Sequence, residues 1–401
     1  MYSSIHIQSE IECRLFVSNT DYGVLKSDGK RYIYNFHGCI VGLRCVNTAD
    51  ESSQYFTIIK DGDYIHLKAE DFKKTLISSV SERDISIGTT DKNGVIYSGD
   101  GKILLRCINK RIKRYKIRSG CEIICDSAFE ECNKIRKIVL PDSLTHIGDC
   151  AFKNCANAYF ELSNKAKTRR YQDPNTKLTI LQLLILPFVL FFELVLSDFD
   201  FNIIIKHSVL PRGLKHIGNM AFYGCKRLFD ISLPDCLEHL GDHAFEECKS
   251  LSYINLPEHL TFIGSRLLSF CPRIESINIP FNVKYICDGA FWGCFKLKSI
   301  EINDNVLGIG DRAFYGCSGM KNVSIEQVEK IVHDVEKCDG QYWPVTYHIY
   351  NLSVVGENAF PYADLSSIQI PHNSKSYFEN IIPTDYHYLL KGKEQIIHQN
   401  N

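Results

Sequence analysis

The sequence predicts a β-rich solenoid of stacked 23-residue coils with short helical turns, preceded by a β-rich N-terminal cap or small domain. Three observations predict this fold class: a recurring Ala-Phe-x-x-Cys motif, a second apolar pattern between its copies, and a length of 401 residues. That length exceeds the ~250–300 residues at which a single compact core stops growing. We therefore expect two domains or an elongated repeat body.

The Ala-Phe-x-x-Cys motif recurs every 23 residues wherever its copies are adjacent, and one copy has Leu267-Leu268 in place of Ala-Phe. Ala lets neighbouring coils approach, Phe fills the core, and Cys serves as a small buried hydrophobe. We expect free thiols, because equivalent side chains on stacked coils point in parallel. The predicted structural core comprises Phe129, Phe152, Phe222, Phe245, Phe291, Phe314, Cys132, Cys155, Cys225, Cys248, Cys271, Cys294 and Cys317.

The second pattern is clearest in the segment Leu228-x-x-Ile231-x-Leu233-Pro234-x-x-Leu237-x-x-Leu240-Gly241. Its alternating apolar residues predict an extended segment with one inward side, and Pro ends that segment because it has no N–H to give. A second short extended stretch follows, and Gly permits the tight turn after it. A period of ~20–29 residues with this spacing is typical of leucine-rich repeats, in which each coil is stabilised by its neighbours.

These motifs resemble the unit L-x-x-I-x-L-P-x-x-L-x-x-I-G-x-x-A-F-x-x-C of the BspA-like leucine-rich-repeat proteins. The resemblance covers roughly Ile117 to Pro371. Such proteins occur on the surfaces of oral bacteria and, in expanded sets, in parasitic protists. The resemblance implies adhesion or another protein–protein interaction rather than catalysis, and it specifies no particular ligand.

We expect three parts in the chain: a β-hairpin-rich cap or domain over 1–106, the solenoid over 107–378, and a polar C-terminal tail over 379–401. The pairs Asp28-Gly29, Asp61-Gly62 and Asp100-Gly101 each lie between apolar stretches, which is a strong short-range indication of a hairpin. A cap is expected because the first coil would otherwise expose its apolar face and strand edge.

Two stretches lack the Ala-Phe motif, at about 157–208 and 326–350. The motifs on either side are nevertheless spaced close to multiples of 23, with 70 residues from Ala151 to Ala221 and 46 from Ala313 to Ala359. We predict degenerate coils in both. The first contains the apolar segment Leu178–Leu196, which is long enough to span a bilayer. Gln182, Glu193 and Pro187 within it disfavour a span, so membrane association is an alternative, as is a locally altered reading frame.

The charge balance argues against a nucleic-acid partner, because 46 Lys and Arg nearly cancel 47 Asp and Glu. No secretory signal or tail anchor is evident, which predicts a cytoplasmic protein, whereas the family resemblance implies the cell surface. Familiar catalytic motifs are missing, so we expect no enzyme and no cofactor.

Two clusters could suggest a metal site, but we expect none. Cys121 and Cys125 lie close to the core residue Cys132 without a fourth ligand at a suitable spacing. His146, His216 and His239 occupy one column of the repeat, but the gap separates the first from the others. We interpret that column as a half-exposed packing row.

The chain is therefore predicted to be a non-enzymatic protein–protein interaction scaffold of the adhesion or surface-antigen type. Its partners are expected to be proteins, bound on the outward side of the first extended segment, which forms the concave sheet of other leucine-rich repeats. The alternatives are a membrane-attached adhesin that uses Leu178–Leu196 and a cryptic enzyme or recognition site in the N-terminal region. The predicted contact residues are Asp230, Ser232, Tyr253, Asn255, Ser276, Asn278, Ser299 and Glu301.

Overall fold

A computed structural model of the chain describes residues 80–163 and 208–327 without a gap, most of 352–392, and the strands within 3–67 and 330–349. The apolar segment Leu178–Leu196 lies outside the described residues. Within the described part, no helix has the length and apolar character that a membrane crossing requires.

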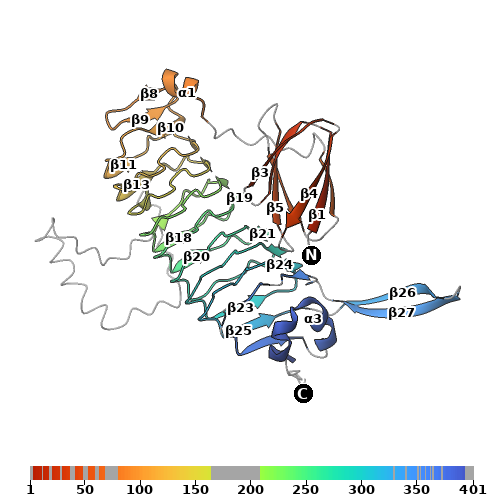
Figure 1. Cartoon of the computed structure of the whole chain (residues 1–401). Helices are drawn as coiled ribbons and strands as arrows, with labels where there is room; N and C mark the ends of the chain where they lie inside the picture. The colour runs from red at the N-terminus through yellow and green to blue at the C-terminus, as the bar shows by residue number, and fades with distance from the viewer. Residues whose placement is uncertain are drawn as a thin grey trace, which may run out of the picture.

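The body of the molecule is a solenoid of about nine coils, each contributing strands to two rows that run along its length (Figure 1). Neighbouring coils pair in parallel within each row. The first row contains β11 (Arg114–Lys116), β13 (Lys137–Leu140), β15 (Tyr159–Leu162), β16 (Ser208–Val209), β18 (Asp230–Ser232), β20 (Tyr253–Asn255), β23 (Ser299–Ile302), β25 (Asn322–Ile325), β29 (Ser367–Ile370) and β30 (Leu390–Gly392).

The second row holds shorter strands, formed where each coil reaches its Ile-Gly or Leu-Gly step. It begins with an antiparallel set and continues as parallel pairs. Its members are β8 (Thr89–Thr90), β9 (Val95–Tyr97), β10 (Ile103–Cys107), β12 (Ile123–Ile124), β14 (His146–Ile147), β17 (His216–Ile217), β19 (His239–Leu240), β21 (Phe262–Ile263), β22 (Tyr285–Ile286), β24 (Gly308–Ile309) and β28 (Val354–Val355).

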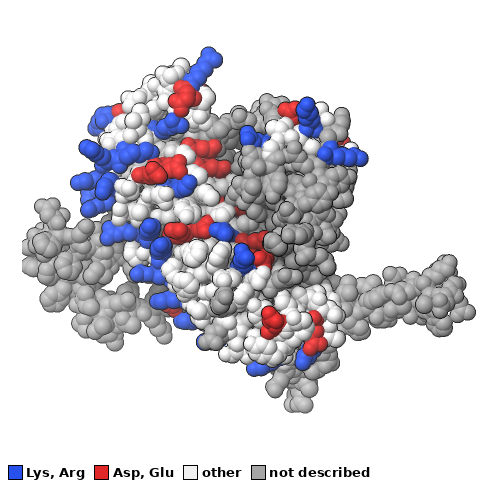
Figure 2. Space-filling view, in the orientation of Figure 1, with Lys and Arg blue, Asp and Glu red and all other residues white. Residues whose placement is uncertain are grey.

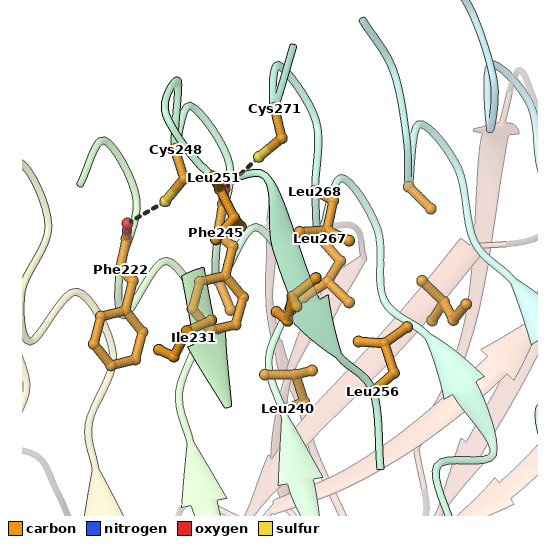
Figure 3. Packing of buried hydrophobic residues seen from close by; sticks show 14 of the residues in the cluster. Phe222, Ile231, Leu240, Phe245, Cys248, Leu251, Leu256, Leu267, Leu268 and Cys271 are labelled. Carbon is orange, nitrogen blue, oxygen red and sulfur yellow. Dashed lines mark hydrogen bonds between the residues drawn. The ribbon is translucent and has the colours of Figure 1, made fainter. Parts of the chain in front are cut away.

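The core lies between the two rows and consists of columns of equivalent apolar residues (Figure 3). All of the predicted core Phe and Cys residues are completely buried. Ring centroids of successive Phe residues lie 5.2 Å apart for Phe222 and Phe245 and 5.3 Å apart for Phe291 and Phe314, with nearly parallel planes. Where adjacent coils both carry Phe, each ring therefore packs on the equivalent ring of the next coil, which is how a coil without a core of its own becomes buried.

The cysteine column is a ladder of free thiols that bond from coil to coil. The Sγ of Cys248 donates to the carbonyl of Phe222, and that of Cys271 to the carbonyl of Phe245, each at 3.2 Å (Figure 3). Burial raises the pKa of Cys317 to about 12 and that of Cys294 well above its ordinary value. These thiols stay protonated and satisfy buried carbonyls, so the column favours a small residue that can donate.

The Ala-Phe-x-x-Cys segment forms a series of tight turns rather than the short helical turn predicted. Backbone bonds three residues apart recur along it, for example from Cys132 N–H to the carbonyl of Phe129 at 3.0 Å. Ser127 and Glu131 interrupt any helix because their φ angles are +54° and +59°, in the left-handed region.

The residue two places after the last apolar residue of each short second-row strand forms a second ladder. The carboxylate of Asp126 accepts the backbone N–H of Asp149 at 2.7 Å, and Asp149 accepts that of Asn219 at 2.7 Å. Asn219, Asp242, Asp288 and Asp311 continue the pattern toward the C-terminus. The preceding Gly148 is required, because a Cβ there would lie 2.3 Å from the Oδ1 of Asp126. The sequence prediction missed this ladder, although the repeated Gly-Asp pair was visible.

The prediction of degenerate coils at about 157–208 is wrong. β14 pairs directly with β17, which places His146 opposite His216, and the rings of Phe152 and Phe222 stack at 5.5 Å. No coil fits between two coils already in contact. The 70 residues from Ala151 to Ala221 are one coil step of 23 and an insertion of 47, whose length happens to be close to two coils.

The prediction of a degenerate coil at about 326–350 is also wrong. β26 (Lys330–Cys338) and β27 (Gln341–Ile349) form an antiparallel hairpin that projects from the solenoid (Figure 1). The coils on either side of the hairpin contact each other, since β24 pairs with β28 and the rings of Phe314 and Phe360 stack at 5.5 Å. The hairpin is therefore an insertion at a single coil.

Both predicted boundaries also shift. β10 (Ile103–Cys107) pairs in parallel with β12, so the coil stack begins before residue 107. The predicted tail includes the end of α3 (Lys375–Ile381), a 3-10 helix, η3 (Thr384–Leu389), and β30, which pairs with β29. Phe378, Ile382 and Leu389 are buried, so residues up to 392 close the C-terminal end of the core.

The N-terminal strands form two sheets of their own, in the orders β4-β1-β7 and β3-β2-β5-β6. They are β1 (Ser3–Ser9), β2 (Cys13–Val17), β3 (Thr20–Leu25), β4 (Gly29–Phe36), β5 (Val41–Asn47), β6 (Ser53–Ile58) and β7 (Asp63–Leu67). Only the third predicted hairpin turn is correct: β9 and β10 pair across Asp100-Gly101, whereas the strands beside Asp28-Gly29 and Asp61-Gly62 pair with other strands. A short helix, α1 (Glu82–Ile87), precedes the first coil and is capped by Ser81.

Candidate interaction surface

The outward side of the first row is the predicted contact surface, and its strands alternate between buried and outward positions. Ile231, Ile254 and Ile300 point inward and are buried. Their neighbours on each strand point outward, and the pairing places Asp230 beside Tyr253 on the adjacent coil. The two-residue period of a strand therefore explains why the outward residues could be identified from sequence.

Tyr253 is the most prominent side chain of this surface. It is 48% exposed, whereas Asp230 and Ser232 on the preceding strand are less exposed. A tyrosine with half of its surface in water exposes part of its aromatic ring to a partner.

Asn255 has a structural role that its position alone did not reveal. Its Oδ1 accepts the backbone N–H of Leu233 at 2.8 Å, and its Nδ2 donates to the carbonyl of the same residue at 3.1 Å. The amide thus bridges two coils where β18 ends. Asn255 therefore belongs to the frame of the surface, with little capacity left for a partner.

The predicted residues of the next two coils lie in different surroundings. Ser276 and Asn278 are exposed, but residues 274–279 form no strand. Ser299 and Glu301 are exposed on β23, where they lie beside Asn322 and Ser324 of β25. The surface is therefore two regular patches separated by one irregular coil.

The three histidines of the second row lie side by side, contrary to the expectation that the gap separates them. The rings of His146 and His216 stack at 5.7 Å, and those of His216 and His239 at 4.4 Å. Burial, with a contribution from Lys215, lowers the pKa of His146. Stacked rings direct their nitrogens side by side rather than toward a common point, so the row is a packing feature.

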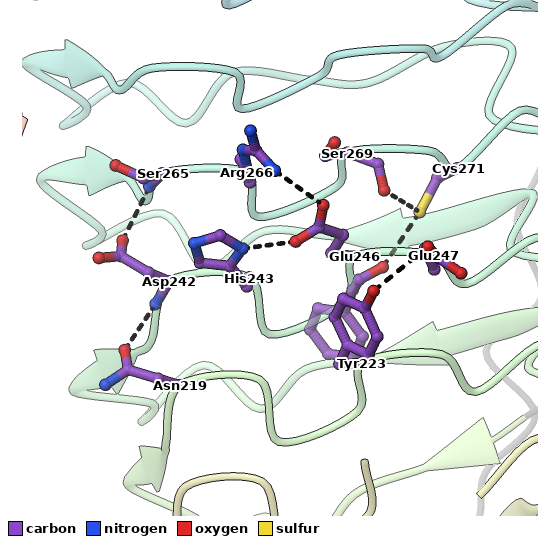
Figure 4. A network of polar contacts seen from close by, with 11 residues as sticks. Asn219, Tyr223, Asp242, His243, Glu246, Glu247, Ser265, Arg266, Ser269 and Cys271 are labelled. Atoms are coloured by element: carbon purple, nitrogen blue, oxygen red, sulfur yellow. Dashed lines mark hydrogen bonds and ion pairs between the residues drawn. The ribbon is translucent and has the colours of Figure 1, made fainter. Parts of the chain in front are cut away.

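A polar network covers the turns of three consecutive coils (Figure 4). Glu246 is nearly buried; it contacts His243 of its own coil and Arg266 of the next coil at 3.6 Å. Tyr223 donates to Glu247 at 3.2 Å. The guanidinium of Arg266 also lies over the ring of Trp292 at 4.8 Å. The network links neighbouring coils, which is a structural use of residue types that also occur in active sites.

The described residues contain no group of three or more His, Cys, Asp or Glu arranged to hold a metal ion. Cys125, from the cysteine cluster, is buried, and burial raises its pKa to about 12, which disfavours the thiolate that a metal needs.

The family follows from the repeat itself. The model of the BspA type leucine rich repeat region matches six copies, over residues 107–172, 197–321 and 271–382. The chain belongs to the BspA-type leucine-rich-repeat family. Repeats of this type form solenoids consistent with protein-interaction scaffolds. No curated protein matches the chain.

Several solved structures are similar to this BspA-type chain. A leucine-rich repeat protein from Bacteroides ovatus is 22% identical, with a TM-score of 0.40, and the match covers 73% of this chain and 70% of that one. The leucine-rich repeat protein of T. pallidum is 23% identical, with a TM-score of 0.35, covering 52% and 90%. The pneumococcal vaccine antigen PcpA is 17% identical, with a TM-score of 0.33, covering 65% of this chain and 48% of the antigen.

Proposed function

We propose that this BspA-type chain is a non-enzymatic scaffold of the adhesion or surface-antigen type that binds protein partners on the outward side of the first row. The observation that supports the proposal most strongly is the half-exposed ring of Tyr253 among small polar residues. Aromatic residues with a polar group dominate the binding energy of protein interfaces, whereas the small residues around them provide a complementary surface.

The neighbours of Tyr253 suit this role. Asp230 lies directly opposite on β18, and Asn255 holds the backbone of the two coils together. The ring therefore stands on a rigid strand, so a partner would lose little entropy in ordering it.

The test compares Tyr253→Ala with the parent protein in quantitative pull-downs from native cells, followed by affinity measurements on the partner identified. We expect binding to weaken about 10- to 100-fold, which corresponds to about 1–3 kcal/mol. The control Lys249→Ala changes an exposed residue away from the first row and should have little effect.

A second control distinguishes binding by the solenoid from binding by the N-terminal sheets. Deletion of residues 1–79 spares α1 and the first coil, both of which lie further along the chain. If a partner's affinity ignored Tyr253→Ala but fell on this deletion, the binding site would belong to the N-terminal strands and the proposal would be wrong.

A further inference from the structure

The first two coils carry a dense group of cations on the first row. Between Lys110 and Arg118, six of nine residues are Lys or Arg. Figure 2 shows Lys and Arg gathered along the side of the molecule where β11 and β13 lie in Figure 1. We define the basic strip as Arg111, Lys113, Arg114 and Lys116 of one coil together with Lys134, Arg136 and Lys137 of the next.

Like charges face each other across the two coils of the basic strip. Arg114 of β11 pairs in register with Lys137 of β13. The backbone N–H of Arg136 bonds the carbonyl of Lys113 at 2.8 Å, so these two residues are also neighbours. Paired strands lie about 4.8 Å apart, and like charges directly opposite each other are destabilising.

Elsewhere in the solenoid, equivalent contacts between coils join opposite charges. Lys215 meets Glu238 at 2.9 Å, and Lys298 meets Glu275 at 2.6 Å. In the basic strip Lys137 has such a partner, Glu161 on β15, at 2.7 Å. No described residue forms an ion pair with Arg111, Lys113, Arg114, Lys116 or Lys134. The strip therefore holds like charges side by side across two coils, and five of its cations have no carboxylate partner among the described residues.

We propose that the basic strip binds a sulfated polysaccharide of the heparin class. Successive outward side chains of a strand are about 6–7 Å apart, and the two coils give two parallel rows of cations. This arrangement suits a linear polymer that carries several sulfates along its length. Arg and Lys together supply forked and point-like cationic donors to such anions. The bound anion would offset the repulsion between the coils.

The exposed surface of the basic strip favours this ligand over other polyanions. The aromatic residue within it, Tyr115, is buried and donates to Asp91 at 2.8 Å. Single-stranded nucleic acids need exposed rings for base stacking, and protein partners usually need an aromatic or apolar anchor. A ligand recognised by charge alone needs neither. This site is separate from Tyr253, so its test is independent of the proposed function.

The experiment titrates a heparin octasaccharide into the full chain by calorimetry at several NaCl concentrations. We expect saturable binding that weakens with salt. The variant Lys113→Gln/Arg114→Gln/Lys116→Gln should weaken binding at least tenfold and lower the salt slope by about 3, roughly one for each cation removed. The matched control Lys226→Gln/Arg227→Gln/Lys249→Gln removes three exposed cations elsewhere and should bind as the parent does.

Four results would overturn the proposal. One is the lack of salt-dependent binding by the parent protein. Another is an equal loss in both triple variants, which would indicate net charge rather than a site. A third is tighter binding, at the same ionic strength, of polyglutamate, a single-stranded oligonucleotide or phosphatidylserine vesicles. The fourth is self-association of the strip variant without any polysaccharide binding by the parent, which would identify the cations as protection of an exposed strand edge.

The melting temperature separates loss of binding from loss of folding. Because neutralising the strip removes a repulsion, the strip variant should melt at or above the temperature of the parent. The charge-conserving variant Lys113→Arg/Arg114→Lys/Lys116→Arg should retain polysaccharide binding, and its failure to do so while folded would contradict recognition by charge.

Discussion

The coil with Leu267-Leu268 and the coil with Ala290-Phe291 show what the repeat can and cannot vary. Leu267, Leu268 and Ala290 are all completely buried. The strands nevertheless differ: β23 follows the Ala-Phe coil, whereas residues 274–279 after the Leu-Leu coil form no strand. The second row is also interrupted there, between β19 and β21. Apolar character and length therefore keep a coil buried without keeping its strands paired.

The spacing between coils explains why the strands are paired after the Ala-Phe coil and missing after the Leu-Leu coil. A Cβ built on Gly241 or Gly310 would lie 2.5–2.6 Å from the backbone of the preceding coil. At Gly264, in the Leu-Leu coil, the nearest such backbone atom would be 3.6 Å away. Leu267 is larger than the Ala of other coils at the position of closest approach, so the neighbouring coils stand further apart.

The largest expected effect comes from removing a buried ring from the Phe column. Phe291→Ala should lower the free energy of unfolding by about 3–5 kcal/mol, because the ring packs on Phe314 and is completely buried. Equilibrium unfolding in urea measures the change. Because each coil contacts its neighbours, the loss should spread locally and reduce cooperativity. A curve that overlays the parent's would show that the Phe column is not the core.

Restoring the repeat should repair the irregular coil. In Leu267→Ala/Leu268→Phe, the introduced ring would stack between Phe245 and Phe291 and form two aromatic pairs worth about 0.5–1.5 kcal/mol each. We expect a net stabilisation of about 1–2 kcal/mol by urea unfolding. Leu268→Phe alone should destabilise the protein by overpacking, because Leu267 still keeps the coils apart. Equal stability of the single and double variants would argue against the spacing explanation.

The second ladder, in which Asp and Asn side chains accept backbone N–H groups of the next coil, predicts that the stability of the protein depends on pH through Asp288, next to the irregular coil. Burial raises the pKa of Asp288 well above its ordinary value, assisted by the carboxylates of Asp311 and Asp242 and opposed by the N–H of Asp311. A carboxyl whose pKa is higher in the folded state stabilises the fold at low pH. That contribution is lost as the pH rises from the unfolded pKa through the folded one.

Asp288→Asn should therefore stabilise the protein at pH 8 by about 0.5–2 kcal/mol and have little effect near pH 4. The amide keeps an oxygen for the N–H of Asp311, as Asn219 does for Asp242 in the same column. Melting temperatures of parent and variant across this pH range test the sign. A stabilisation that is the same at both pH values would contradict the titration of Asp288.

The smallest expected effect comes from a substitution that fills the gap in the second ladder. Ser265 occupies the ladder position of the Leu-Leu coil, and its buried hydroxyl has no hydrogen-bond partner within the described residues. Ser265→Asn should reach the backbone N–H of Asp288 and add about 0.5–1.5 kcal/mol, the net value of one hydrogen bond. Ser265→Ala leaves the ladder open, so the difference between the two variants isolates the ladder bond. Equal melting temperatures would show that no bond forms.

Repeated columns made most of the fold predictable. A column such as Phe222, Phe245 and Phe291 meets the same environment in every coil, so its burial follows from periodicity. Insertions do not share that environment, and motif spacings near multiples of 23 concealed the insertions at 157–208 and 326–350. Direct pairing of His146 with His216 shows what counting residues could not, namely which coils are neighbours.

The candidate surface was predictable to the level of which side chains point outward. Strand alternation identified Tyr253 and Glu301 correctly as exposed. It could not show that Asn255 bridges to Leu233, because that contact depends on the offset between two coils. The basic strip was visible as a run of cations, but the lack of ion pairs at Lys113, Arg114 and Lys116 among the described residues could be seen only from the positions of the carboxylates in neighbouring coils.

Native-state hydrogen exchange of the Leu-Leu coil tests most directly the claim that residue identity at the coil contacts controls strand pairing. The amides of residues 276–279 should exchange faster than those of 299–302, because the former lie in no strand and the latter in β23. In Leu267→Ala/Leu268→Phe, protection of 276–279 should rise toward that of 299–302. Equal protection of the two segments in the parent protein, or no change in the double variant, would contradict the account.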